Sequence, residues 1–409
     1  MNIVLEPGAA ALLDALHRAG FGAYAVGGCV RDSLLGLAPH DWDLCTAARP
    51  GQVMELFGED RCIPTGLQHG TVTVKRDGKL YEITTFRTEG RYSDGRHPDS
   101  VAFVPDLRED LARRDFTINA MAYSAEEGLC DPFGGREDLA RGVVRAVGEP
   151  LRRFGEDALR ILRLYRFAAR FGFAIDEATE AAAKQLASHL DCVSAERIEE
   201  ELNKLLAAPQ PGAYLEPEVL AFVLPELPPE ELTKARRRID ALPAGAEQVS
   251  ARWAALLLPL GETGARKALK RLKCSNARID GAAALVRECG EKTPDALDKC
   301  DLRLQAKRLL GKYDLHTVQQ LTALWTALAP EEKASFDALR AEAEALTAQG
   351  VCCRISQLAV NGRDLMEAGA APGPGLRRVL EALLEEVITG RLPNEKTELL
   401  AFAAGFSAS

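Results

Sequence analysis

The sequence predicts an α+β head with a small mixed sheet, followed by an all-helical remainder. Strand-like and helix-like segments alternate through residues 1–150, whereas helical periodicity dominates after about residue 150. The chain has 409 residues, which is too long for one ordinary hydrophobic core, so we expect about two to four structural units.

The first elements of the head are predicted from local patterns. Residues 1–20 have the apolar spacing of an amphipathic helix, and residues 21–26 form a short apolar strand that ends in two glycines. A helix is expected over residues 30–35. A further strand is expected around residues 41–45.

A β-hairpin and a long loop are predicted next. Residues 72–75 and 80–86 are strand-like and are joined at Asp77-Gly78, a strong turn signal because glycine accepts positive φ. Residues 88–100 are rich in Gly, Arg, Ser, Asp and Pro and have no apolar period. We therefore expect a mobile loop there.

The remainder of the chain is predicted to be helical, with proline-rich breaks at residues 209–217 and 225–229. The helix predicted near the end of the chain, over residues 375–389, is followed by Gly390. Glycine favours the position after a helix C-terminus. The clearest predicted helices cover residues 156–171, 177–189, 195–206, 251–258 and 375–389.

Composition indicates a globular cytoplasmic protein. Hydrophobic residues make up 47% of the chain and charged residues 27%, and no apolar run is long enough to cross a bilayer. The N-terminus lacks the pattern of a signal peptide. The 10 cysteines are scattered without a C-x-x-C pair, so we expect free thiols in a reducing compartment rather than a zinc site or disulfides.

The net charge of −9 does not exclude a nucleic-acid partner, because polyanion binding needs only a local basic patch. Two such clusters occur in the sequence. The first runs through Arg152, Arg153, Arg160, Arg163, Arg166 and Arg170, and the second through Arg266, Lys267, Lys270, Arg271, Lys273, Arg278, Lys307, Arg308 and Lys312.

Asp41 and Asp43 form the first candidate site, a D-x-D triplet. In a strand their side chains project from the same face, while Trp42 and Leu44 point to the other. Two close carboxylates repel each other, and a divalent cation relieves that repulsion. Magnesium binds carboxylate and phosphate oxygens together, which suits phosphoryl transfer. An isolated D-x-D triplet is usually a solvated turn, so this motif needs support from others.

That support begins with the segment GGCVRD at residues 27–32, between the predicted strand and helix. Paired glycines such as Gly27 and Gly28 let backbone N–H groups approach a phosphate, and Arg31 offers a forked cation to it. Taken alone, the segment also fits a tight turn with a surface arginine. A Gly-Gly turn followed shortly by D-x-D is far more specific than either part.

Two later segments add arginines beside carboxylates. The first is RRDFTINAMA at residues 113–122, in which arginines beside an Asp and an Asn are able to hold a triphosphate and a ribose hydroxyl. A helix end with a local ion pair is an equally good interpretation of that segment alone. The second is GEDALRILR at residues 155–163, where Asp157 and Arg160 are three apart and share one face if the segment is helical.

Asp157 and Arg160 are suited to reading a base, although a surface ion pair is the simpler interpretation. Cytosine and adenine each present an amino donor beside a ring-nitrogen acceptor, whereas uracil and guanine present a carbonyl beside a ring N–H. A carboxylate acceptor with a guanidinium donor fits the first two bases and leaves polar groups unpaired with the others.

Together these motifs resemble those of class II tRNA nucleotidyltransferases, the CCA-adding enzymes, which share the polymerase-β-like superfamily with bacterial poly(A) polymerases. The motifs occur in family order: GGCVRD at 27–32, DWD at 41–43, RRDFTINA at 113–120, DPFGG at 131–135 and EDALR at 156–160. The resemblance is strong over residues 23–206 and returns at NGRDLM (361–366) and GRLPNE (390–395), with little match between 209 and 350.

The resemblance implies a catalytic head over residues 1–150, a helical neck over 151–210 that recognises the nucleotide, and a helical body (211–345) and tail (346–409) that bind the tRNA acceptor arm. It implies that magnesium ions at Asp41 and Asp43 promote attack of the RNA 3′-hydroxyl on the α-phosphate of CTP or ATP. The resemblance suggests Glu82 as a third acidic residue near the metal ions, although Glu82 fits a solvated strand position equally well. The nucleotide-binding residues implied are Gly28, Arg31, Arg114, Asp157, Arg160, Arg163 and Arg166, with Asp115 as a ribose contact.

Alternatives within and outside this family remain open. A poly(A) polymerase has the same chemistry, although such enzymes usually extend into a strongly basic C-terminal region that is not seen here. A partial enzyme adding only CC or only A is harder to exclude, and the predicted loop at 88–100 argues against the CC-only type. A catalytically dead RNA-binding scaffold is disfavoured because both aspartates are present. The sequence has no cluster of His and Asp residues of the kind that an additional metal-dependent phosphohydrolase domain needs. We therefore expect no such domain.

Overall fold

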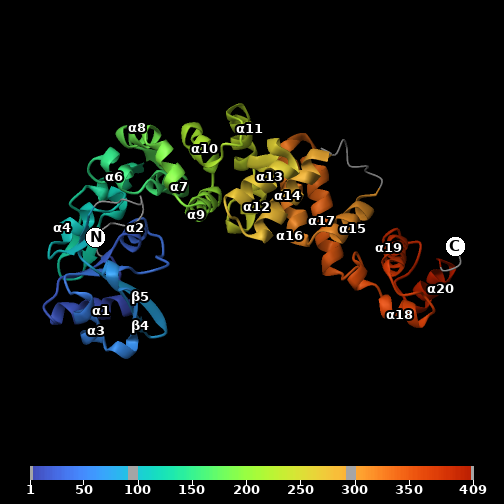
Figure 1. The fold of residues 1–409 in the computed structure, drawn as a ribbon, viewed down its shortest axis with the longest axis horizontal. Coiled ribbons are helices and arrows are strands. Elements are labelled where there is room, and N and C mark those ends of the chain that lie inside the picture. Colours follow the sequence, from blue (N-terminus) through green and yellow to red (C-terminus); the bar gives the residue numbers. More distant parts are fainter. Residues whose placement is uncertain (1–2, 91–99, 292–300, 407–409) are drawn as a thin grey trace. The chain divides into compact units, whose positions relative to one another are not determined.

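The computed structural model describes residues 3–90, 100–291 and 301–406. The chain divides into two compact units. The first unit comprises Met1–Pro229 with Arg271–Lys273, and the second comprises Glu230–Lys270 with Cys274–Ser409. Figure 1 shows that the described strands belong to the N-terminal part of the chain and that helices make up the C-terminal part. The predicted α+β head and helical remainder are therefore confirmed.

The head is built on a seven-stranded mixed sheet with strand order β3-β4-β5-β2-β1-β8-β9. Strands β2 and β5 are parallel, and the other neighbouring pairs are antiparallel. This pairing places the start of β2 beside the middle of β5. The strands are β1 (Ala23–Val26), β2 (Leu44–Thr46), β3 (Cys62–Gly66), β4 (Thr71–Arg76), β5 (Lys79–Thr85), β8 (Ala122–Ser124) and β9 (Gly128–Cys130).

Helices α1 (Pro7–Arg18), α2 (Gly28–Leu34) and α3 (Pro50–Phe57) pack against this sheet (Figure 1). The amphipathic helix predicted at the N-terminus is α1, which buries Leu12 and Leu16 because they recur on one face. Two further helices of the head are α4 (Leu107–Ala112) and α5 (Gly135–Arg141).

The predicted hairpin between β4 and β5 is confirmed. Asp77 and Gly78 have φ angles of 50° and 78°, as a tight two-residue hairpin turn requires. The predicted loop at residues 88–100 is partly wrong. Thr88 lies in β6 (Arg87–Glu89), which pairs antiparallel with β7 (Val101–Phe103). Residues 91–99 lie outside the described part of the chain.

The predicted strand around residues 41–45 begins later than expected. Strand β2 starts at Leu44, so Asp41 and Asp43 precede it and the alternation argument for their side chains is wrong. Only the carbonyl of Asp43 takes part in pairing, where it accepts a hydrogen bond of 2.9 Å from the backbone of Val26. The triplet thus lies at the entrance of a strand and not within it.

The predicted helix over residues 156–171 is two helices. Helix α6 (Pro150–Glu156) ends before Asp157, whose φ of −143° and ψ of 105° are extended, and α7 runs over Leu159–Phe171. Beyond it, the helix predicted over residues 177–189 is shorter, because α8 ends at Gln185 and a 3-10 helix follows. The remaining first-unit elements are β10 (Val143–Val144), β11 (Ala174–Ile175), α8 (Glu177–Gln185), α9 (Ala195–Leu206) and α10 (Pro217–Val223).

All secondary-structure elements described in the second unit are helices. Trp253 is fully buried in it, and Leu365, Leu383 and Leu399 form a smaller core near the C-terminus. Gly390 follows the last turn of α19 with φ of 75°, as predicted for a residue that closes a helix. The helices, with α11 starting at the boundary, are α11 (Pro229–Asp240), α12 (Val249–Leu257), α13 (Gly261–Arg271), α14 (Asn276–Glu291), α15 (Leu302–Lys312), α16 (Leu315–Leu328), α17 (Lys333–Ala348), α18 (Gly362–Glu367), α19 (Pro374–Ile388) and α20 (Lys396–Phe406).

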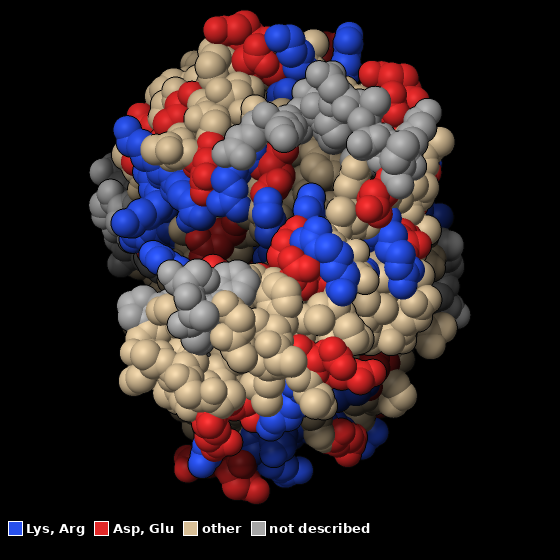
Figure 2. Space-filling view, turned by 90° about the vertical axis from the view of Figure 1, so that its right-hand side faces the viewer, with Lys and Arg blue, Asp and Glu red and all other residues tan. Residues whose placement is uncertain are grey.

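On the face that Figure 2 draws, several groups of Lys and Arg side chains occur, with Asp and Glu side chains among them. All nine cysteines among the described residues are free thiols, and seven of them are buried. No helix in the described ranges is long and apolar enough to cross a membrane.

A pair of glutamates at the start of α10 makes stability depend on pH. Burial, together with the hydrogen bond and charge of Glu218, raises the pKa of Glu216 from its ordinary value of 4.5 to about 7 against the opposing effect of Lys184. The stability associated with protonated Glu216 is present below pH 4.5 and is lost as the pH rises through about 7. We expect Glu216→Gln to raise the melting temperature at pH 8 more than at pH 5. Thermal unfolding followed by circular dichroism checks this, and equal shifts at both pH values would contradict it.

Candidate active site

A cavity of about 660 Å³ in the first unit brings the predicted site residues together. Its wall includes all nine residues named as catalytic or nucleotide-binding from the sequence: Gly28, Arg31, Asp41, Asp43, Arg114, Asp157, Arg160, Arg163 and Arg166. Residues 41 and 43 come from the head, whereas residues 157 to 166 come from the helices that follow it. A volume of this size accommodates a ligand as large as a nucleotide.

The Gly-Gly turn forms one wall of the cavity. Gly27 has φ of 79°, which is costly for other residues, and a Cβ atom there would lie 2.9 Å from a guanidinium nitrogen of Arg114. The glycine therefore permits the chain to turn directly from β1 into α2 while Arg114 lies against the turn. Gly28 lines the same wall.

Arg31 is buried and firmly held. Its Nε donates to Asp32 at 2.8 Å and its Nη1 donates to Asn119 at 2.5 Å. Its guanidinium also lies over the rings of Phe167 and Phe171, about 5 Å from each centroid. A cation held in this way needs little reorganisation to meet an anion, so the geometry suits phosphate binding.

Both aspartates line the cavity and are exposed to solvent. Asp41 lies 3.0 Å from His40. Nearby protein atoms partly desolvate Asp43 and raise its pKa, the charges of Glu82 and Asp41 raise it further, and Arg114 opposes them. This mutual repulsion is the electrostatic condition that a bound cation relieves.

The donor set at this point fits magnesium bound jointly with a nucleotide. In the described part of the chain, no three His, Cys, Asp or Glu side chains converge as a metal site. Glu82 influences Asp43 through its charge, but its tentative assignment as a further ligand gains no support. Magnesium typically uses one or two protein carboxylates and completes its shell with phosphates and water.

Asp115 holds an arginine in place. Burial alone raises the pKa of Asp115, but the charge and hydrogen bonds of Arg163 and a hydrogen bond from Asn119 outweigh it, so the pKa lies well below its ordinary value. One carboxylate oxygen accepts from Arg163 at 2.6 and 2.9 Å. The other accepts from Asn119 and from the backbone of Phe116. Both oxygens are thus engaged within the protein, and Asp115 also lines the cavity, so its ribose contact stays a prediction.

Asp157 and Arg160 do not form the helical pair that their spacing suggests. Asp157 lies in the break between α6 and α7, and its Oδ1 accepts from the backbone of Leu159 at 3.0 Å. The carboxylate thus accepts from the first residue of α7, a role that Asp commonly has near a helix start. The hydrogen bond to Leu159, and not helical periodicity, therefore sets the direction of the Asp157 side chain. Asp157 still lines the cavity with Arg160.

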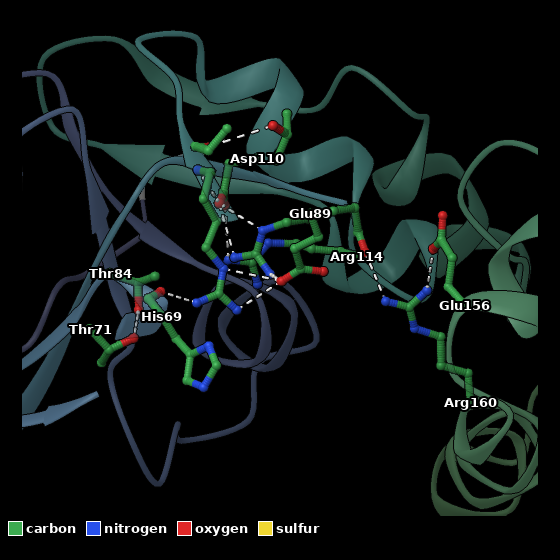
Figure 3. Close-up of polar contacts among 12 residues, drawn as sticks. His69, Thr71, Thr84, Glu89, Asp110, Arg114, Glu156 and Arg160 are labelled. Carbon is green, nitrogen blue, oxygen red and sulfur yellow. Dashed lines mark hydrogen bonds and ion pairs between the residues drawn. The ribbon is translucent and has the colours of Figure 1, made fainter. Parts of the chain in front are cut away.

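Arg160 is held by three acceptors. Its Nη1 donates to Glu156 at 2.8 Å and to the carbonyl of Arg153 at 3.0 Å. Its Nη2 donates to the carbonyl of Arg113 at 3.1 Å. Figure 3 shows Arg160 pointing toward Glu156, with a second contact to a backbone oxygen. The guanidinium plane is consequently fixed before any ligand binds.

Helix α7 carries a row of arginines along the cavity. Arg163 and Arg166 lie over the ring of Phe167, at 5.5 and 3.9 Å from its centroid. Arg166 also pairs with Glu201 at 2.5 Å. Their three-residue spacing places them on one helical face, where they give the cavity positive charge.

Sequence reasoning missed several residues of this wall. Arg197 and Lys204, both on α9, approach from an element that carries no recognised motif. Phe167 was hidden within an apolar helical pattern. Arg197 and Lys204 are seven residues apart, which places them on one face of a helix. That spacing was the one sequence signal that both cations could line the same cavity. The missed residues are Phe167, Arg197 and Lys204, whereas Arg113, Asn119 and Arg170 were named within a motif or a basic cluster.

Three family models match successive parts of the chain. The poly(A) polymerase head domain matches residues 23–145, a probable RNA- and SrmB-binding site of polymerase A matches residues 172–228, and a tRNA nucleotidyltransferase domain 2 matches residues 246–403. The head fold and the cavity thus define a nucleotidyltransferase of the polymerase-β-like superfamily, whose members typically use divalent metal ions.

Curated relatives extend the similarity along the whole chain. A CCA-adding enzyme of Limosilactobacillus fermentum is 38% identical over 96% of this chain and 95% of its own length. A CCA-adding enzyme of Geobacillus stearothermophilus is 37% identical over 96% and 95%. The crystal structure of the Bacillus stearothermophilus CCA-adding enzyme in complex with CTP has a TM-score of 0.80 at 34% identity, covering 98% of both chains. The chain therefore belongs to the class II CCA-adding enzymes, a family of tRNA nucleotidyltransferases. The similarity includes residues 209–350, where the motifs alone gave little match.

Proposed function

We propose that this protein adds C, C and A to the 3′ end of tRNA from CTP and ATP without a nucleic-acid template, in a magnesium-dependent reaction in the cytoplasm. The observation that carries the proposal is the single cavity that joins two acidic residues, Asp41 and Asp43, to the candidate base-reading pair, Asp157 and Arg160. A relative solved with CTP supports the choice of nucleotide.

Asp41 and Asp43 would hold the metal. Magnesium bound there supplies charge neutralisation at the triphosphate and lowers the pKa of the attacking 3′-hydroxyl. The role of the two carboxylates is to place that charge at the cavity wall beside the Gly-Gly turn. Arg114, whose charge acts on Asp43, balances the carboxylates when the site is otherwise empty.

Gly28, Arg31 and Arg114 bind the triphosphate. The absence of side chains at the Gly-Gly turn lets phosphate oxygens approach the backbone, and Arg31 is oriented in advance by Asp32 and Asn119. Arg163 and Arg166 extend the positive charge along α7. Positioning and charge account for the acceleration, so the reaction needs no covalent intermediate.

Asp157 and Arg160 select the base. The Asp157 carboxylate accepts a hydrogen bond from the amino group of cytosine or adenine, and the Arg160 guanidinium donates to the neighbouring ring nitrogen. With uracil or guanine, a carbonyl would face the carboxylate and a ring N–H would face the guanidinium. Leaving those buried groups unpaired is the basis of rejection.

The four predicted segments have separate roles in this proposal. The head (1–150) holds the metal and triphosphate, and the neck (151–210) reads the base. The body (211–345) and tail (346–409) grip the acceptor arm of tRNA through its backbone and shape. Exposed cations of the second unit that suit this role include Lys234, Arg237, Lys267 and Lys270.

Three tRNA transcripts test the proposal: one ending at the discriminator base, one after the first C and one after the second C. Each is incubated with the protein, Mg²⁺ and CTP, ATP or both, and a parallel set contains EDTA. We expect two C additions followed by one A and then arrest, with no products in EDTA. Addition of CC alone or A alone would identify a partial enzyme, and long A tails on any RNA would identify a poly(A) polymerase. No incorporation under any condition would overturn the proposal.

A further inference from the structure

We infer that Arg197 is a positioning residue that clamps Asp157 and thereby sets the preference for C and A over U and G. This inference rests on the proposed base-reading role of Asp157. Arg197 belongs to α9 and carries none of the motifs that define the rest of the site. Its contact with Asp157 joins α9 to the break between α6 and α7.

The contact is direct and shielded from solvent. Nη2 of Arg197 donates to Oδ2 of Asp157 at 2.8 Å, and the two side chains are only 19% and 15% exposed. The other carboxylate oxygen, Oδ1, accepts from the backbone of Leu159. Asp157 is therefore fixed at both oxygens by groups from two different elements.

The break between the helices explains why Asp157 needs a clamp. Its backbone is extended between α6 and α7, and its carbonyl accepts from the backbone of Arg160 at 3.0 Å. Without Arg197, the cap to Leu159 is the contact that remains among those identified for its carboxylate, and the carboxylate gains freedom to rotate about it. A reading group that rotates loses the fixed acceptor direction on which discrimination depends.

Arg197 itself is anchored by the packing of its helix. Helix α9 packs against α7 and buries Ile198, Leu202 and Leu205 in the neck. The backbone of Arg197 is therefore held by the same core that holds Arg160 and Arg163. The clamp and the base-reading pair are consequently parts of one rigid arrangement.

The clamp leaves room for the base. Each carboxylate oxygen has two lone pairs, so Oδ2 can accept from Arg197 and from an exocyclic amino group together. An acceptor of fixed direction repels the carbonyl of uracil or guanine placed at the same point.

Arg197→Met is expected to lower kcat/KM for CTP and ATP by about 10- to 100-fold, as for loss of a shielded charge-assisted hydrogen bond. The kcat/KM for UTP should change by less than about threefold, so the ratio of kcat/KM for CTP to that for UTP falls by about threefold or more. Arg197→Lys restores a cation without the planar fork, and we expect it to recover part of the ratio. The measurement is single-turnover incorporation of each nucleoside triphosphate on tRNA that ends at the discriminator base.

Arg141→Met is the matched control, since Arg141 makes an exposed ion pair with Glu137 on α5 and does not line the cavity. The ratio of kcat/KM for CTP to kcat/KM for UTP in this variant should equal that of the unmodified protein. A folded Arg197→Met protein whose ratio stays within twofold would overturn the inference. If Arg197→Met does not fold, as judged by circular dichroism, Arg197→Gln and Arg197→Lys provide the same comparison.

The outcomes also separate this inference from the proposed function. If Arg160→Met loses selectivity and Arg197→Met keeps it, base reading stands and the clamp fails. If neither variant changes the CTP-to-UTP ratio, or the unmodified protein does not discriminate, the proposed base-reading role itself fails.

Discussion

Asp43→Asn is expected to lower the rate of CTP incorporation by at least about 1,000-fold. The substitution keeps the size of the side chain and removes the charge that would hold magnesium beside the triphosphate. Metal ions supply several kcal/mol of charge stabilisation in such reactions, and about 1.4 kcal/mol corresponds to a factor of ten in rate. Single-turnover incorporation on tRNA lacking its last three nucleotides measures the effect.

The control for Asp43→Asn is Asp77→Asn. Asp77 lies in the hairpin turn with φ of 50°, a conformation that asparagine tolerates, so this variant removes a carboxylate without touching the cavity. It should retain full activity. Binding of tRNA, measured separately by filter retention, should be unchanged in Asp43→Asn. An Asp43→Asn protein with more than a tenth of the normal rate would contradict the metal assignment.

Arg160→Met is expected to lower kcat/KM for CTP and ATP by about 100-fold or more. The substitution removes the proposed donor to the ring nitrogen, and a site built to hydrogen-bond its ligand is strongly weakened when a partner is lost. The expected loss is smaller for UTP, because Arg160 makes no favourable contact with its ring N–H. Comparing all four nucleoside triphosphates on the same tRNA measures both effects.

Arg152→Met is the matched control for Arg160→Met. Both arginines pair with Glu156. Arg152 does so at 3.2 Å from an exposed position and does not line the cavity that holds the candidate site. Glu156 keeps its contact with Arg153 in either variant, so neither change strands a buried charge. Equal losses in Arg152→Met and Arg160→Met would show that the effect comes from Glu156 and not from contact with the base.

The sequence predicted the head well because its signals are local. The amphipathic face of α1 and the Asp77-Gly78 turn each depend on a few adjacent residues. The start of β2 was misplaced because the D-x-D triplet imitates a strand pattern, while pairing of the sheet begins only at the Asp43 carbonyl. Tertiary pairing, which local periodicity does not encode, decided that boundary.

The candidate site was predicted as a set of residues but not as a geometry. Asp157 and Arg160 lie in the same cavity, yet Asp157 lies in the break between two helices, where its side chain accepts from the Leu159 amide, and Arg160 lies within α7. Arg197 could not be predicted, since its role depends on how α9 packs against α7. Spacing along one segment does not reveal contacts between segments.

The most direct test of this account is a crystal structure of the protein with Mg²⁺ and a non-reactive CTP analogue. We predict metal density between Asp41, Asp43 and the triphosphate. We also predict that the cytosine amino group lies within hydrogen-bonding distance of Asp157 and that N3 lies within the same distance of Arg160. A nucleotide whose base lies away from Asp157 and Arg160, or whose triphosphate lies away from Asp43, would contradict the account.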